Sequence, residues 1–104
     1  MKLYRLRPRA REDRRAEVLH YRRGDGAKVA ANLVQAMSRA LLELELNPAI
    51  GSPTLGKDLG IKGLRTWRVD GFPLSFWYFD RDDHVDVARL IGQRQDQRGI
   101  PIEG

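Results

Sequence analysis

The sequence predicts a small α+β domain in which an N-terminal strand and a helical hairpin precede three strands. One long segment has apolar residues at helical spacing, and three later segments have the short apolar patterns of strands. The connections between those three segments are short, which favours an antiparallel meander. The expected order is therefore β-α-α-β-β-β, with the N-terminal strand and helical hairpin packed on one face of a small antiparallel sheet.

The N-terminal region predicts a short edge strand and then a helix. Residues 3–7 alternate weakly, and Pro8 suits the first turn of a helix, where its missing N–H is not required. A thin apolar stripe, widened by arginine stems, consists of Ala10, Val18, Leu19 and Tyr21. Residues 24–26 read GDG, which breaks the chain as a turn between two helices requires.

The second helix gives the strongest secondary-structure signal in the chain. Its apolar positions follow a 3-4-3-4 spacing, with polar residues on the opposite face. These positions are Ala30, Leu33, Met37, Ala40 and Leu44, and the apolar side is broadened by Val34, Leu41 and Leu42. We expect Leu33, Met37 and Leu44 to be buried against the sheet. Asn47-Pro48 should end the helix, because a residue before proline is pushed out of helical geometry.

Three strands are predicted after a loop rich in Gly and Pro that spans residues 47–63. Their ranges are residues 63–69, 74–80 and 84–91. The middle strand is apolar on both faces, which is typical of a central strand. Because the helical hairpin can cover only one face of the sheet, we expect Trp and Phe side chains on the other face to form an apolar patch. Such a patch usually marks a binding surface.

The first of these strands reads GLRTWRV, and neither of its faces is cleanly apolar. Alternate residues of a strand point to opposite faces. The two sets are Arg65, Trp67 and Val69, and Leu64, Thr66 and Arg68. Each face must therefore meet a surface that tolerates arginine.

The composition limits the classes of protein to which this chain can belong. A chain of 104 residues with 41% apolar residues predicts one domain with a modest core. No apolar run approaches the roughly 18 residues of a membrane span, and the N-terminus is too polar for a signal peptide. The absence of cysteine excludes disulfides and thiolate metal sites. We expect a soluble cytoplasmic domain over residues 1–97, followed by a tail over residues 98–104.

The positive charge is concentrated at the N-terminus. Residues 1–15 contain seven basic and two acidic side chains, so the whole net charge of +5 lies in this segment. Such a field favours an acidic partner, either nucleic acid or an acidic protein segment, although a solvated helix face would carry the same pattern.

No catalytic residue, metal site or cofactor is expected from the residues themselves. Asp82, Asp83 and Asp86 cluster near a turn but fit no calcium-loop pattern, and no phosphate-binding glycine loop precedes a helix. His20 and His84 are expected to be solvated. Several cations could bind phosphate, since arginine forks suit phosphate oxygens: Lys57, Lys62, Arg65, Arg89 and Arg94.

The ordered set of segments resembles the ParE branch of the RelE/ParE toxins of bacterial type II toxin–antitoxin systems. A strand leads into PRAREDRR, the helical hairpin ends at NPAIG, and the three strands read GLRTWRV, LSFWYFD and HVDVARLIGQRQD. Gly63-Leu64-Arg65 opens one strand, an aromatic strand follows, and Arg89 precedes a terminal Asp96, as in the family. The resemblance covers roughly residues 3–97. Where the family often has His, this chain has Gly92.

The resemblance implies a toxin without enzymatic activity that inhibits DNA gyrase and blocks replication. It also implies a cognate ParD-like antitoxin, with a ribbon-helix-helix DNA-binding half and a disordered tail that folds on the toxin. The candidate residues for binding the antitoxin or the target are Arg65, Trp67, Arg68, Trp77, Arg89 and Arg94. In the alternative interpretation, Trp67 belongs to the core and Arg65 pairs internally with Asp70 or Asp96.

Two other function classes stay open. A RelE-like toxin would cleave messenger RNA on the ribosome, which generally requires a Tyr or another acid/base group near the C-terminus. This chain has no tyrosine after Tyr78. A basic nucleic-acid-binding module is compatible with the arginine-rich N-terminus, although no reading motif supports it.

Overall fold

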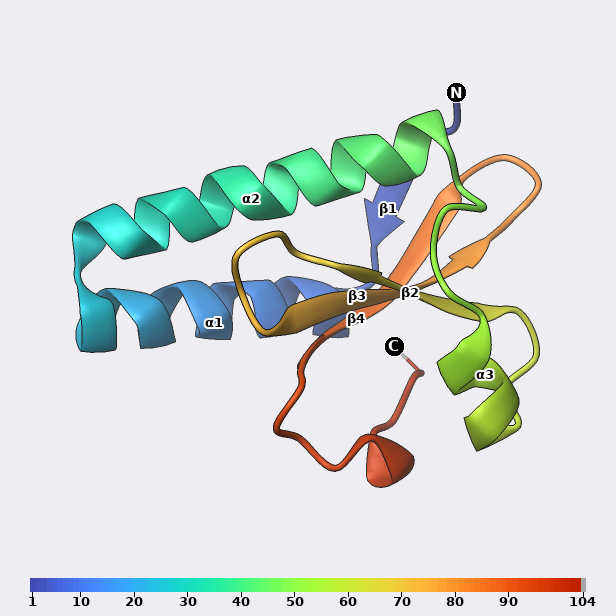
Figure 1. Ribbon diagram of the computed structural model, residues 1–104. Coiled ribbons are helices and arrows are strands. Elements are labelled where there is room, and N and C mark those ends of the chain that lie inside the picture. Colours follow the sequence, from blue (N-terminus) through green and yellow to red (C-terminus); the bar gives the residue numbers. More distant parts are fainter. Residues whose placement is uncertain (104) are drawn as a thin grey trace.

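The computed structural model describes residues 1–103 of the chain and has the predicted element order (Figure 1). The strands are β1 (Tyr4–Leu6), β2 (Leu64–Arg68), β3 (Leu74–Asp80) and β4 (Val85–Gly92). The helices are α1 (Pro8–Asp25), α2 (Ala27–Leu46) and α3 (Thr54–Leu59), with a 3₁₀ turn η1 (Gln97–Gly99). Helix α3 lies inside the segment that we expected to be a loop, so the sequence did not predict it.

The sheet is mixed, with strand order β1-β4-β3-β2. The meander β2-β3-β4 is antiparallel, as predicted from its short connections. Strand β1 pairs with the neighbouring β4 in parallel, so the expectation of a fully antiparallel sheet is corrected at this edge. No short turn joins these two strands, and the helical hairpin belongs to the long connection that a parallel pair requires.

The helical hairpin covers one face of the sheet (Figure 1). The two helices are separated at Gly26, whose φ of 94° is a backbone conformation that glycine adopts readily. Helix α2 ends at Asn47, as predicted. All five core positions of α2 are buried, and Leu33, Met37 and Leu44 are at most 2% exposed. None of the described helices is long and apolar enough to cross a membrane.

The opposite face of the sheet is covered as well, so the expectation of an uncovered apolar patch is wrong. A second core forms there from Leu64, Trp77, Phe79, Ala88 and Ile91. Helix α3, the connection that follows it and the C-terminal segment supply its cover through Leu55, Leu59, Ile61, Ile100 and Ile102. These apolar residues are scattered among Gly, Pro and charged residues, which is why no periodicity revealed this layer.

Close packing between backbones holds α3 on strand β2. A Cβ added to Gly56 would lie 2.5 Å from the carbonyl oxygen of Leu64, so only glycine allows the helix to approach this closely. The helix ends at Gly60 in the left-handed conformation, where the backbone N–H donates to carbonyl groups of the last turn.

Candidate functional site

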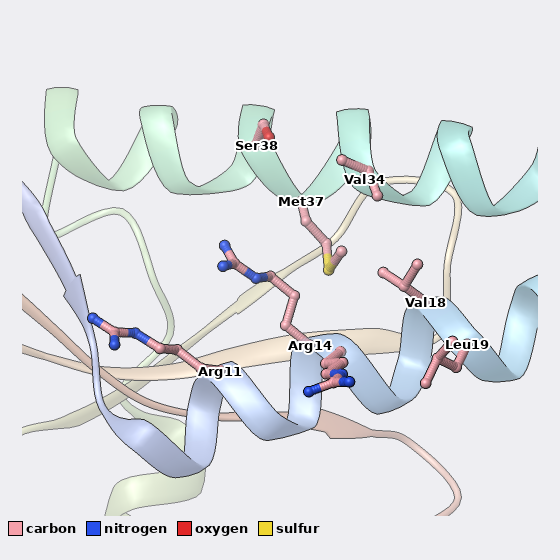
Figure 2. Close-up of a pocket in the computed structure, with 8 residues that line it drawn as sticks. Arg11, Arg14, Val18, Leu19, Val34, Met37 and Ser38 are labelled. Carbon is pink, nitrogen blue, oxygen red and sulfur yellow. The ribbon is translucent and has the colours of Figure 1, made fainter.

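A groove of about 580 Å³ runs between α1 and α2. Figure 2 shows Val18 of α1 facing Val34 and Met37 of α2 across it, and Leu19 of α1 also lines it. Leu19 is 39% exposed and Val34 is 45% exposed, whereas Met37 belongs to the main core. The groove therefore has an apolar floor that is continuous with the core and apolar walls that are open to solvent.

The apolar wall on α2 continues beyond the groove. Val34, Ser38, Leu42 and Leu46 recur every four residues and so lie along one side of the helix. Leu42 is 50% exposed and Leu46 is 66% exposed. We expected Val34, Leu41 and Leu42 to broaden the buried side of α2; this is wrong for Val34 and Leu42, whereas Leu41 is buried. Val34, Leu42 and Leu46 therefore form an exposed apolar strip along α2.

Arginine side chains from α1 rim the groove. They are Arg11, Arg14 and Arg15. In Figure 2, Arg14 reaches from α1 toward α2, whereas Arg11 extends sideways from α1. Within residues 1–103, no carboxylate lies at ion-pair distance from any of these three guanidinium groups. The groove thus combines apolar area with uncompensated positive charge, which is complementary to an amphipathic segment that carries acidic residues.

Arg65 and Trp67 of the GLRTWRV strand both form hydrogen bonds within the chain. Arg65 Nη1 donates to the carbonyl oxygens of Gly51 at 2.6 Å and Ala49 at 3.3 Å. Trp67 is half-buried against the main core, and its Nε1 donates to Glu43 at 3.3 Å. Of the alternative interpretation, packing of Trp67 against the core is confirmed. The pairing of Arg65 with Asp70 or Asp96 is wrong, because loop carbonyls bind this guanidinium.

Arg89 is buried and connects β4 to α1. Its Nε and Nη2 donate to the two carboxylate oxygens of Asp13 at 2.7 and 3.0 Å, and its Nη1 donates to Pro101 O at 2.7 Å. The hydrogen bond to Asp13 raises the pKa of Arg89 above its ordinary value, although burial opposes the shift. Arg89 is only 7% exposed, so it is not part of the surface in this conformation.

The other candidate residues lie in separate places. Trp77 is fully buried under the second core's cover, and its Nε1 has no partner among the described residues. Arg68 is exposed and borders a pocket of about 420 Å³ together with Trp67 and residues of α2. Arg94 is exposed and borders another pocket, of about 460 Å³, beside His20. The six candidates therefore do not form a single site.

The aspartates near the β3–β4 turn bond within the chain. Asp86 accepts from Arg7 Nη2 at 2.8 Å and from Arg81 Nε at 3.1 Å. Burial alone would raise the pKa of Asp86, but the hydrogen bonds and charges of the two arginines outweigh it and hold the pKa below its usual value. Asp83 contacts His84 at 2.6 Å, so this histidine is tied to the turn.

A comparison with protein families adds a decisive observation. The sequence model described as "ParE toxin of type II toxin-antitoxin system, parDE" matches residues 4–97, which is most of the chain. This chain belongs to the ParE toxin family. The resemblance predicted from the ordered segments is confirmed.

A solved structure supports the fold of this ParE family member. The structure titled "Chromosomal ParDE TA system from P. aeruginosa" superposes with a TM-score of 0.74 at 21% sequence identity. The alignment covers 88% of this chain and 96% of the other. No curated protein matches this sequence.

The sequence analysis of this ParE-family chain missed the groove. It assigned Val18, Leu19 and Val34 to the packing faces of their helices, and it treated the N-terminal arginines as a general charge field. One signal was available in the sequence. Val34 and Leu42 lie outside the 3-4-3-4 positions of α2, and an apolar residue outside the buried stripe points to a surface that another molecule covers.

Proposed function

We propose that this chain inhibits DNA gyrase, and thereby replication, and that a cognate antitoxin neutralises it. Membership of the ParE toxin family supports the toxin role. The proposed antitoxin is ParD-like, with a ribbon-helix-helix DNA-binding half and a tail that is disordered until it folds on the toxin. Because the proposed target acts on chromosomal DNA, the proposed place of action is the cytoplasm.

The groove between α1 and α2 is the proposed docking site for the antitoxin tail. The observation that carries this assignment is the apolar floor surrounded by unpaired Arg11, Arg14 and Arg15. A tail helix with apolar residues at i, i+3 and i+4 and carboxylates on its flanks would fill the floor and neutralise the rim. The exposed strip through Leu42 and Leu46 would extend the contact along α2.

Four of the residues proposed from the sequence stay candidates for contacts with antitoxin or target. Arg68 and Arg94 are exposed, and Arg65 and Trp67 are partly exposed. Trp77 and Arg89 would take part only if the C-terminal segment moved from the second core. For that movement, Pro101 and the isoleucines beside it would have to leave the sheet.

The absence of enzymatic activity is part of the same proposal. Proton transfer requires a titratable group at the reacting oxygen, and no tyrosine follows Tyr78 in the sequence. The aromatic pocket on the second face, which contains Trp77 and Ser75, has Asp58 as its charged lining residue. A carboxylate at that place does not favour the binding of an RNA phosphate.

The test is a pair of assays with the purified full-length chain. In the first assay, gyrase supercoils relaxed plasmid with increasing amounts of the chain. We expect supercoiling to be lost or the cleavage complex to be trapped, and the antitoxin to restore activity. In the second assay, messenger RNA is followed in a translating extract, where we expect no new cleavage.

Codon-dependent cleavage with unaffected gyrase would contradict the proposal in favour of a RelE-like ribonuclease. DNA binding without either effect would favour a nucleic-acid-binding module.

A further inference from the structure

A second concave site lies between α3 and β2, away from the groove of the helical hairpin. Its volume is about 400 Å³, within the range of small-ligand pockets. Lys57, Lys62 and Arg65 are three of the residues that line it, and no carboxylate is among the lining residues. The sequence analysis named these cations as possible phosphate ligands, and the fold brings them to one pocket.

Arg65 is held in a fixed position at this pocket. Its Nη1 donates to the carbonyl oxygens of Ala49 and Gly51, so the loop at residues 48–51 anchors one end of the guanidinium. The loop is itself fixed, because the Tyr78 hydroxyl accepts from Gly51 N and donates to Pro48 O. Among the described residues, Arg65 Nε and Nη2 have no hydrogen-bond partner. These two groups form a positioned donor pair.

The two lysines supply charge that is free to approach a ligand. Lys57 and Lys62 are exposed, and no carboxylate of residues 1–103 lies at ion-pair distance from either amine. Three of the other residues on the pocket wall are glycines, Gly56, Gly60 and Gly63, which add no side chain to it. Ile61 and Leu64 add an apolar wall.

This arrangement fits a compact anion attached to a flat or apolar group. An arginine fork and flexible ammonium groups are suited to the several oxygens of a phosphate. An acidic helix presents its carboxylates along a line, whereas these three basic residues border one pocket. The apolar wall could contact a sugar or a base beside the phosphate.

We propose that the pocket between α3 and β2 binds the phosphate group of a nucleotide, in a DNA backbone or in a free nucleotide, through Lys57, Lys62 and Arg65. This site is separate from the proposed antitoxin groove. It requires neither gyrase nor antitoxin, so it can fail or succeed independently of the proposed function.

The test measures binding of the full-length chain to a fluorescein-labelled 20-base-pair DNA duplex and, separately, to AMP and inorganic phosphate. The variant is Lys57→Ala/Lys62→Ala, which changes two exposed side chains that have no bonds in the fold. The control is Arg23→Ala/Lys28→Ala, which removes the same charge at the far end of the hairpin (Figure 1).

We expect the double lysine variant to bind at least about tenfold more weakly than the control variant. If the ligand is duplex DNA, the slope of log affinity against log salt should also fall by about two for the two lost phosphate contacts. If AMP binds and the duplex does not, the phosphate group that the pocket recognises belongs to a free nucleotide. Equal affinity of the two variants, or no binding of duplex, AMP or phosphate, would overturn the proposal.

Discussion

Gly51 lies where no larger residue fits. A Cβ at this position would be 2.4 Å from the Tyr78 hydroxyl oxygen and 2.8 Å from the carbonyl oxygen of Thr66. The same hydroxyl bonds the loop backbone on both sides of Ala49. The loop that positions Arg65 therefore depends on a residue without a side chain.

We predict that Gly51→Ala lowers the free energy of unfolding by about 1–3 kcal/mol, the usual cost of forcing an extra methyl group into a packed site. Urea unfolding measures this change. Gly24→Ala is the matched control, because Gly24 lies in α1 with no atom within 4 Å of the added Cβ. That substitution should raise stability by about 0.5–1 kcal/mol through helix propensity. Equal stability of the two variants would contradict the loop's dependence on Gly51.

Adjacent residues of α2 have opposite environments, which gives a sharp test of the helix orientation. Leu33 is fully buried, whereas Val34 is 45% exposed in the groove. We predict that Leu33→Asp unfolds the domain, since a buried unpaired carboxylate costs several kcal/mol against a total stability of roughly 5–15 kcal/mol. Val34→Asp should fold with a melting temperature close to that of the original chain. If Leu33→Asp melted normally, the assigned face of α2 would be wrong.

At the scale of elements, ion pairs join segments that are distant in sequence. Asp13 of α1 bonds both Arg89 and the backbone N–H of Leu90 in β4. Asp86 of β4 bonds Arg7, which lies between β1 and α1, and Arg81 at the β3–β4 turn. These bonds help to fix α1, and with it one wall of the groove, relative to the sheet.

The Asp86 cluster predicts an acid-sensitive contribution to stability. The pKa of Asp86 is lower in the folded chain than the roughly 3.9 of an unfolded aspartate, because its two arginine partners outweigh burial. The unfolded chain therefore binds this proton more readily. The stabilisation is present above about pH 4 and is lost as the pH falls through the folded-state pKa.

The free energy of unfolding, measured between pH 7 and pH 2, checks this prediction. We expect Asp86→Asn to be less stable than the original chain at pH 7, because Arg7 and Arg81 lose their charged partner. The difference should shrink below about pH 4. A difference that stayed constant over the whole range would show that the Asp86 charge does not stabilise the fold.

Element patterns explain which parts of the fold were predictable. The 3-4-3-4 spacing of α2 and the alternation in β3 are local signals, and both gave the correct faces. Helix α3 has only six residues and begins after Pro53, so it contains too little periodicity to be recognised. The parallel pairing of β1 with β4 joins residues about 80 positions apart and leaves no local signal.

At the scale of the whole molecule, the sheet is a central layer between two unequal covers. The helical hairpin covers one face, and α3 with the C-terminal segment covers the other (Figure 1). The sequence predicted that arginine and tryptophan on the sheet would mark the partner surface. That inference selected Trp77 and Arg89, which are buried. The C-terminal tail had not been recognised as a layer on the sheet, so the second face was assumed to be exposed to solvent.

The groove could not have been predicted from the same reasoning. Its walls come from two helices whose relative rotation follows from the packing of the whole hairpin on the sheet. Val34 and Leu42 lie beside the 3-4-3-4 positions of α2, but so does the buried Leu41, and only the observed rotation of the helix shows which of the three reach the surface. The charge analysis did find the relevant segment, since Arg11, Arg14 and Arg15 belong to the arginine-rich N-terminus.

The most direct test of the account is the affinity of the proposed cognate antitoxin for variants of the groove. Isothermal titration should show that Val34→Asp and Arg11→Ala/Arg15→Ala each weaken binding at least about tenfold while melting normally, because central apolar contacts and desolvated charges dominate such interfaces. Arg22→Ala/Arg23→Ala, which removes the same charge from α1 outside the groove, should bind as the original chain does. Unchanged affinity of both groove variants would contradict the central claim that this groove receives the antitoxin.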